Sequence, residues 1–311
     1  MQTILGAGGA IGTELAKVLP QYTDKIRLVS RSPEKVNPSD ELFSADLTDA
    51  ESVMKAVEDS DVCYLAVGLK YDKKVWVRMW PVIMRNVIDA CEKHHSKLVF
   101  FDNVYMYDPN HLNPMTEETP VNPSSEKGKV RAKIIDMLWN AVEAGKIEAL
   151  VARSADFYGP GFDKPVSILS ETVFKPLSQG SKANWLGGDS FKHSYTYTPD
   201  AGKATALLGN TAEAYNQTWH LPTASNPYTG KEWVEQIAEE LNQKPRYRTA
   251  SKFVVRLLGL FMPVMRESVE MMYQYDRDYV FNSDKFEKRF NMEPTSYIEG
   301  IREVAKTDFQ S

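Results

Sequence analysis

Cysteine is scarce in this chain: Cys63 and Cys91 are the only two among 311 residues, and both lie in apolar runs. Two cysteines cannot form a disulfide framework, so the composition favours buried free thiols and a reducing, cytoplasmic location. The five histidines show none of the spacings that bind a metal ion, and no Gly-x-Ser-x-Gly sequence is present. The sequence therefore predicts neither a metal centre nor a serine hydrolase.

A basic excess is also lacking. Lys and Arg number 37 against 42 Asp and Glu, for a formal net charge of −5. This balance argues against a nucleic-acid partner, because little positive charge is available to neutralise phosphates. Long hydrophobic runs are missing too: the most apolar late stretch, Phe253–Met265, contains Arg256 and Pro263 and is too short to span a bilayer. We expect an amphipathic helix that covers a cleft there, with contact to a membrane as the alternative.

Short β-branched runs alternate with longer helical patterns in the first half of the chain. The expected strands are Thr3–Leu5, Ile26–Ser30, Leu42–Ala45, Val62–Val67, Leu98–Phe101 and Glu148–Arg153. The expected helices are Ile11–Leu19, Ala50–Glu58, Lys74–His94 and Lys127–Glu143. Such alternation predicts right-handed crossovers and a parallel sheet with helices on both faces.

We therefore predict an α/β fold with a Rossmann-type doubly wound parallel sheet and a small mixed C-terminal substrate lobe. Residues 1–158 are the expected dinucleotide-binding domain. Residues 159–311, where glycine, proline and aromatic residues become frequent, are the expected smaller lobe. The two are interleaved, and parts near 194–221 are expected to return to the first domain.

Glycines crowd the first strand–helix junction, where Gly6, Gly9 and Gly12 lie three apart and Ala10 and Ile11 open the helix. Glycine is needed there for a tight turn, for close approach of the backbone to a pyrophosphate, and for helix–strand packing. The positive end of the helix then faces the phosphates. The sequence predicts an NAD or NADP site at this turn.

The end of the second strand favours NADP over NAD. Ser30, Arg31 and Ser32 stand there, with no carboxylate before Glu34. A carboxylate at this place holds the free 2′-hydroxyl of NAD, whereas a guanidinium with flanking hydroxyls suits the 2′-phosphate of NADP. The alternative is a solvated surface arginine.

The three-apart glycine spacing resembles the short-chain dehydrogenase/reductase superfamily, and later segments resemble its extended, epimerase/dehydratase-like branch. Those segments are Asp46-Leu47-Thr48-Asp49, Ala66-Val67-Gly68, Arg153–Gly161 with its Tyr-Gly-Pro-Gly end, and Tyr197–Asp200. The resemblance implies that Asp46 and Leu47 lie at the adenine, and that Ala66, Val67 and Gly68 line the cofactor.

The resemblance breaks at the active site, where the family uses a Ser or Thr after the fifth strand and a Tyr-x-x-x-Lys pair on the next helix. Aligning Tyr107 with the family's Val-Tyr-Gly places Asn103 at the serine, Lys127 at the catalytic tyrosine and Arg131 at the lysine. Residues four apart share a helix face, so we expect Arg131 to bind ribose or phosphate. Lys127 is expected to act as a general acid on the condition that desolvation and Arg131 lower its pKa strongly. The alternative is a basic, solvated helix start. Tyr105 ranks first as a substitute acid.

The resulting functional prediction is an NAD(P)-binding, epimerase/dehydratase-like oxidoreductase with an atypical active site, acting on a small polar or sugar-like substrate. The alternative is a non-catalytic regulatory protein that senses NADP. The expected substrate contacts in the second lobe are Phe157, Tyr158, Trp185, His193 and Tyr197. We also expect a homodimer through the helices at 74–94 and 127–143, which carry more large apolar residues than one sheet face needs. These residues are Trp76, Trp80, Met84, Met137 and Trp139.

Overall fold

The computed structural model describes residues 1–161 and 167–309, which form two compact units. Unit 1 consists of Met1–Met106, Glu126–Ser154 and Pro199–Leu221. Unit 2 consists of Tyr107–Ser125, Ala155–Thr198 and Pro222–Ser311. Residues 107–125 fall within the predicted dinucleotide-binding domain, 1–158, but in the structure they pack with unit 2.

Unit 1 is built on a seven-stranded sheet in the order β10-β6-β5-β4-β1-β2-β3, and every pairing is parallel. The strands are β1 (Gln2–Leu5), β2 (Ile26–Ser30), β3 (Glu41–Ser44), β4 (Val62–Leu65), β5 (Lys97–Asp102), β6 (Ala149–Arg153) and β10 (Thr218–His220). The chain builds outwards from β1 to β3 and then returns to β4 on the other side of β1. This reversal is the switch point at which doubly wound sheets bind ligands. The predicted fold class is confirmed.

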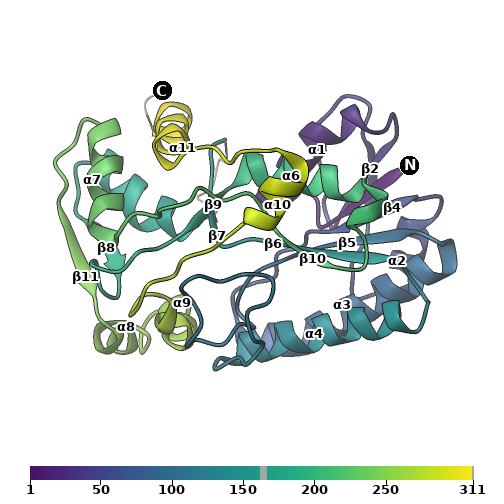
Figure 1. Ribbon diagram of the computed structural model, residues 1–311, viewed down its shortest axis with the longest axis horizontal. Coiled ribbons are helices and arrows are strands. Elements are labelled where there is room, and N and C mark those ends of the chain that lie inside the picture. Colours follow the sequence, from purple (N-terminus) through teal and green to yellow (C-terminus); the bar gives the residue numbers. More distant parts are fainter. Residues whose placement is uncertain (162–166, 310–311) are drawn as a thin grey trace. The chain divides into compact units, whose positions relative to one another are not determined.

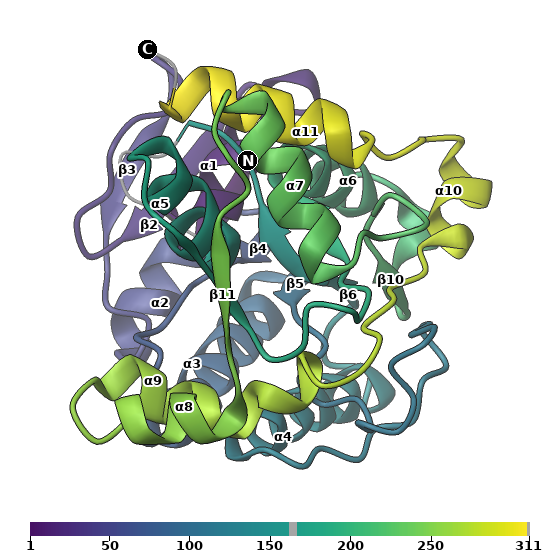
Figure 2. The ribbon, with the colours of Figure 1, turned by 90° about the vertical axis from the view of Figure 1, so that its left-hand side faces the viewer.

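Helices cover both faces of this sheet, with α2, α3 and α4 on one face and α1 and α6 on the other (Figures 1 and 2). The helices are α1 (Ala10–Val18), α2 (Ala50–Val57), α3 (Lys73–His94), α4 (Glu126–Glu143) and α6 (Thr198–Gly209), with short 3-10 turns at Leu19–Gln21 and Ala212–Ala214. Because the sheet is covered on both sides, β4 is buried along its whole length and consists of Val-Cys-Tyr-Leu. The long helix α3 begins at the Asp72 side chain, which caps two backbone N–H groups, and ends at His95 in the left-handed conformation.

Unit 2 has two small parallel pairs of strands, β7 (Asp156–Tyr158) with β9 (Tyr195–Tyr197), and β8 (Ala183–Leu186) with β11 (Tyr247–Ala250). Its helices are α5 (Lys175–Ser178), α7 (Gly230–Glu240), α8 (Lys252–Leu258), α9 (Pro263–Ser268), α10 (Asp284–Phe290) and α11 (Tyr297–Val304), with π turns at Ser170–Phe174 and Ala305–Phe309 and a 3-10 turn at Val269–Gln274. Trp233 of α7 lies at the centre of the core, with Tyr158, Tyr195 and Tyr297 around it.

Two expectations about apolar residues are corrected. Trp76, Trp80 and Met84, which were expected at a dimer face, are buried inside unit 1, and only Met137 and Trp139 of that set are half-buried. The surplus apolar surface therefore belongs to the packing of α3 against α4 and the sheet.

The stretch 253–265 is not one cleft-covering helix. It consists of α8 and α9 joined by a short turn, and most of its apolar side chains are exposed. Among the described residues, no helix combines the length and the apolar character that crossing a membrane requires.

Candidate functional site

The turn after β1 has a backbone geometry that requires glycine. Gly6 has φ of 98°, and a Cβ built there would lie 2.3 Å from the Cα of Val67. The N–H groups of Gly6 and Ala7 both donate to the carbonyl of Val29, at 2.9 and 3.0 Å. No other residue fits both the positive φ and the close approach, so this position fixes the turn against β2 and the end of β4.

The opposite side of the turn is open. Gly8 has φ of 93°, and a Cβ there would meet nothing within 4 Å. Gly9 is the N-cap of α1 and supplies no side-chain acceptor, so the first N–H groups of the helix have no side-chain cap. Gly12 packs close to the Gly6 carbonyl, while Ala10 and Ile11 are buried. An open glycine turn at an uncapped helix N-terminus is a cradle that fits a pyrophosphate.

The side chain of Arg31 is exposed just past the end of β2. The Ser44 hydroxyl donates to the Arg31 carbonyl, and the Ser32 N–H donates to the Ser30 hydroxyl, so the backbone here is held in place. The backbone N–H and hydroxyl of Thr48 bind Asp46 and lower the pKa of its carboxyl, with a smaller contribution from the charge of Arg31. The carboxyl ends of β2 and β3 therefore present one exposed cation beside an ionised carboxylate.

The other predicted cofactor residues follow β3 and β4. Leu47 is buried, Ala66 and Val67 are half-buried, and Gly68 is exposed with open space where a Cβ would stand. Val67 is the residue that Gly6 approaches. The predicted set therefore lies along the carboxyl ends of β1 to β4.

Asn103 and Tyr105 follow the end of β5 and are both half-buried. The Asn103 Oδ1 accepts a hydrogen bond from the backbone N–H of Tyr105 at 3.0 Å. The Tyr105 ring stacks on Trp76, with centroids 6.1 Å apart and an interplanar angle of 15°. Packing thus sets the direction of the tyrosine while part of it stays accessible.

Lys127 is completely buried in the first turn of α4. Its Nζ lies 4.4 Å from the centroid of the Tyr71 ring, a cation–π contact. The alternative of a solvated basic helix start is therefore wrong for this residue. Lys127 and Arg131 share the buried face of α4, as their spacing predicts.

Arg131 is held by an acid and by aromatic rings. Its Nε lies 3.2 Å from the Asp102 Oδ1, an ion pair without hydrogen-bond alignment. Its guanidinium lies 4.3 Å from the Trp80 ring centroid, 5.2 Å from that of Trp76 and 5.4 Å from that of Phe100. Burial lowers the pKa of Arg131, and Asp102 opposes that effect. These contacts hold the guanidinium in the core of unit 1, and binding of ribose or phosphate by Arg131 stays a prediction.

Sequence reasoning missed the partner of Arg131. Asp102 is fully buried and also binds Arg153, whose Nε and Nη2 donate to Oδ2 at 3.2 and 3.1 Å. Asp102 and Arg153 are register partners on the neighbouring parallel strands β5 and β6. The signal in the sequence was an acid and a base at the ends of adjacent strands.

The predicted substrate residues of unit 2 lie mostly in its core. Tyr158, Trp185, His193 and Tyr197 are buried, and only Phe157 is half-buried. These four side chains pack in the core of unit 2, and their predicted substrate contacts stay a prediction.

His193 shows that role in detail. Its Nε2 lies 3.0 Å from the Asp156 Oδ2, and its ring stacks between Tyr275 and Tyr279 with centroid distances of 4.7 and 4.3 Å. The Tyr275 hydroxyl donates to the same carboxylate oxygen at 3.2 Å. This is a polar network inside an aromatic core.

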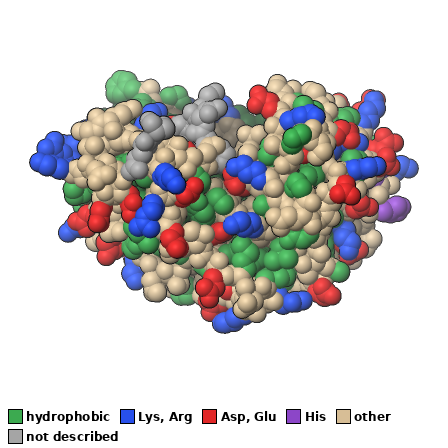
Figure 3. Space-filling view, turned by 90° about the horizontal axis from the view of Figure 1, so that it is seen from above, with side chains coloured by type: hydrophobic (Ala, Val, Ile, Leu, Met, Phe, Trp, Pro, Cys, Tyr) green, Lys and Arg blue, Asp and Glu red, His purple; other side chains and the backbone are tan. Residues whose placement is uncertain are grey.

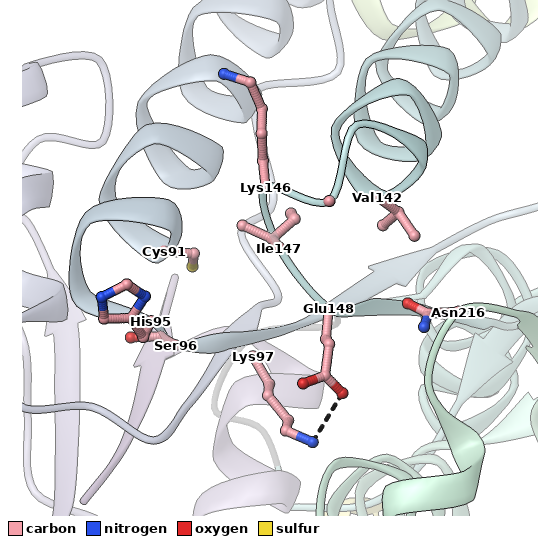
Figure 4. Close-up of a pocket in the computed structure, with 10 residues that line it drawn as sticks. Cys91, His95, Ser96, Lys97, Val142, Lys146, Ile147, Glu148 and Asn216 are labelled. Carbon is pink, nitrogen blue, oxygen red and sulfur yellow. Dashed lines mark hydrogen bonds and ion pairs between the residues drawn. The ribbon is translucent and has the colours of Figure 1, made fainter.

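A hollow of about 320 Å³ lies at the amino ends of strands β5, β6 and β10 of unit 1 (Figure 4). Lys97 begins β5 there, and its Nζ forms an ion pair with the Glu148 carboxylate at 2.9 Å; both residues line the hollow. Cys91 also lines it, and a hydrogen bond with Cys63, together with burial, raises the pKa of the Cys91 thiol. Because this hollow is at the amino ends of the strands, it is separate from the glycine turn at their carboxyl ends.

A family match is consistent with a dinucleotide site at the glycine turn. Residues 3–220 match the profile described as the NAD dependent epimerase/dehydratase family. An uncharacterized protein, y4nG, of Sinorhizobium fredii is 22% identical over 212 residues, which are 67% of this chain and 52% of that protein. This chain thus spans about half the length of that curated relative.

Solved structures share the fold at low identity. The UDP-glucose 4-epimerase of Thermus thermophilus, in complex with NAD, superposes with a TM-score of 0.80 at 17% identity. The match covers 100% of this chain and 99% of the epimerase chain. A double mutant of DesIV, the dTDP-glucose 4,6-dehydratase of Streptomyces venezuelae, with NAD bound, superposes with a TM-score of 0.78 at 13% identity. The match covers 98% of this chain and 96% of the DesIV chain. At these identities the likeness concerns the fold.

Proposed function

The chain belongs to the NAD dependent epimerase/dehydratase family, and we propose that it is an NADP-dependent enzyme of that family with an atypical active site. Its substrate is a small polar or sugar-like compound, of which a nucleotide-linked sugar is one class. The open glycine turn at the uncapped start of α1 carries this proposal. It provides room and backbone donors for a pyrophosphate, and the family membership supports the same ligand.

Arg31 supports the choice of NADP over NAD. Its side chain is exposed at the end of β2, next to hydroxyl groups of Ser30 and Ser32, where a 2′-phosphate is expected. The two structural neighbours described above hold NAD, so the choice for this chain rests on its own residues.

Titration of the purified protein with each cofactor tests this choice. NADP is expected to bind more tightly than NAD. Hydrogen bonds to a charged group contribute about 1.5–3 kcal/mol, so Arg31→Ala is expected to weaken NADP binding about 10- to 100-fold and to leave NAD binding within about twofold. Lys35→Ala is the matched control, because the Lys35 Nζ donates to the Pro38 carbonyl instead. Tighter binding of NAD to the unaltered protein would contradict the proposal.

A bound nicotinamide supplies or accepts a hydride, and the chain must then move a proton to or from the substrate oxygen. Tyr105 is the proposed proton donor and acceptor, through its phenolic Oη. Partial exposure and a ring direction fixed by Trp76 support this role. The Asn103 amide nitrogen is proposed to donate to a substrate oxygen, because the side-chain Oδ1 is occupied by the Tyr105 N–H. Lys127 places a buried positive charge at the start of α4 and is proposed to favour an anionic oxygen nearby.

Kinetics of Tyr105→Phe test this assignment. General acid–base catalysis contributes about 10²–10⁴-fold in rate, so kcat is expected to fall by about that factor in oxidation of NADPH with a panel of keto sugars and small carbonyl compounds. The cofactor dissociation constant should stay within about twofold. Tyr71→Phe is a control, since it keeps the aromatic ring beneath Lys127 and removes only a hydroxyl. Unchanged turnover in Tyr105→Phe would remove this tyrosine from the chemistry.

A non-catalytic NADP sensor is the second candidate. It is favoured by Arg131, which stands where the family keeps its catalytic lysine but is committed to Asp102 and the aromatic rings. A sensor would bind NADP and NADPH, turn over no member of the panel, and bind a partner protein differently in the two redox states. Cofactor oxidation or cofactor-retaining isomerisation that Tyr105→Phe abolishes would exclude it.

A further inference from the structure

Residues 251–268 of unit 2 form a hairpin of two short helices, α8 and α9, with an apolar outer surface. We call this segment the apolar hairpin; α8 and α9 lie side by side in it (Figure 2). Its exposed apolar side chains are Phe253, Val254, Leu257, Leu258, Leu260, Phe261, Met262 and Val264. Phe253 and Leu260 are 74% exposed and Phe261 is 83% exposed. Isolated exposed apolar residues are ordinary, but eight within twelve positions mark an interaction surface.

The hairpin is a fixed part of unit 2. Val255 is fully buried against Leu186, Met272 and Tyr275, and Met265 packs on the same cluster. This cluster holds the inner side of both helices.

The two helices also pack tightly against each other. A Cβ at Gly259 would lie 2.9 Å from the Cα of Arg266, so glycine is needed for the close approach of α8 and α9. The Phe261 and Met262 N–H groups both donate to the Leu258 carbonyl and close the turn between the helices. The exposed side is therefore presented in a defined direction, held by contacts on the inner side.

The charge of the apolar hairpin indicates which kind of partner fits this surface. Lys252, Arg256 and Arg266 are exposed, whereas Glu267, the one acidic residue of α8 and α9, is buried. The whole chain has a net charge of −5, and on the face seen in Figure 3 acidic and basic side chains are interspersed. A second copy docked hairpin to hairpin would bring three cations against three cations. An anionic lipid surface complements both the cations and the apolar side chains.

We propose that the apolar hairpin anchors the protein to an anionic membrane surface. Phe253, Leu260 and Phe261 insert among the upper acyl chains, and the three cations lie at the phosphate level of the lipid headgroups. The segment is too short to cross a bilayer, so the protein lies on one leaflet. This assignment is independent of the proposed enzymatic function.

Sedimentation of the full chain with lipid vesicles tests the anchor. Binding is expected with vesicles of phosphatidylcholine and phosphatidylglycerol, and little with phosphatidylcholine alone. Phe261→Glu is expected to lower the partition coefficient about tenfold or more, since it replaces a buried apolar group in the bound state with a charge. Neutralising Lys252 or Arg256 with Gln is expected to lower it about fivefold for each residue, and added salt should act in the same direction. Val121→Glu is the matched control, because Val121 is also an exposed apolar residue of unit 2.

Phe261→Ser is a second variant that removes the ring without adding a charge, and it should weaken binding in the same direction. Circular dichroism of each variant must match that of the unaltered protein. Absence of binding to the anionic vesicles overturns the proposal, and so does binding that Phe261→Glu and Phe261→Ser leave unchanged. A dimer in light scattering that Phe261→Glu dissociates, with no vesicle binding, would assign the hairpin to self-association instead.

Discussion

Replacement of Asp102 by Asn is expected to destabilise unit 1 far more than replacement of Arg131 by Met. Asp102 lies between two buried arginines, with contacts of 3.2 Å to Arg131 and 3.1 Å to Arg153. Removing its charge takes the Asp102 carboxylate away from two buried guanidinium groups. Breaking a buried ion pair in this way costs about 3–5 kcal/mol, a large part of the roughly 5–15 kcal/mol that stabilises a native domain.

Arg131→Met has the opposite electrostatic effect. The Asp102–Arg153 pair, with its two hydrogen bonds, remains, and the cluster changes from a net positive triad to a neutral pair. The variant loses a cation–π contact of about 2 kcal/mol with Trp80, but methionine fills the aromatic pocket without a desolvated charge. We expect a net loss of no more than about 2 kcal/mol.

Urea denaturation followed by circular dichroism and tryptophan fluorescence measures both variants. Because the chain has two compact units, the transitions from the two probes are compared before a free energy is assigned. Arg78→Met, an exposed position on α3, is the matched control and should lie within about 0.5 kcal/mol of the unaltered protein. Equal losses from Asp102→Asn and Arg131→Met would refute this reasoning. If Arg131→Met lost NADP binding at unchanged stability, Arg131 would be assigned a role in binding the cofactor.

Three smaller predictions follow from backbone geometry. Gly6→Ala places a Cβ 2.3 Å from Val67 and should abolish NADP binding in a fluorescence titration and lower the melting temperature. Gly8→Ala meets open space, so only its positive φ is strained; we expect a loss of about 1 kcal/mol in urea denaturation, and a melting temperature as low as that of Gly6→Ala would contradict this. Thr229→Ala removes the capping box with Glu232 at the start of α7 and should cost about 1 kcal/mol in urea denaturation, without affecting NADP binding.

The framework of unit 1 could be predicted because its signals are local. Strand β2 has the predicted bounds, Ile26–Ser30, and α3 and α4 each begin one residue before the predicted position. Buried parallel strands consist of short apolar runs, and the glycine turn depends on residues that are neighbours in sequence. The order of the sheet then follows from the right-handed crossovers.

The interior of the candidate site depends on contacts between distant residues, and these could not be predicted in the same way. Lys127 is predicted as a general acid, with a solvated helix start as the alternative, and neither interpretation includes its cation–π contact with Tyr71. Arg131 meets Asp102, which is 29 positions earlier in the chain, and the sequence shows the two residues but not their pairing. The helical spacing predicts that Lys127 and Arg131 share one face of α4. The burial of that face depends on how the helix packs, which the spacing does not indicate.

The aromatic setting of Arg131 also affects how the site can change. With the predicted alignment of Lys127 and Arg131 to the family's tyrosine and lysine, a tyrosine–lysine pair would require substitutions at both 127 and 131. A lysine at 131 would lose the guanidinium contact with the Trp80 ring and place a more strongly hydrated charge beside Asp102. A tyrosine at 127 would remove the cation that packs on Tyr71 while Arg131 still occupied the second position. The two replacements are thus epistatic, and a tyrosine–lysine pair is hard to introduce at these two positions one residue at a time.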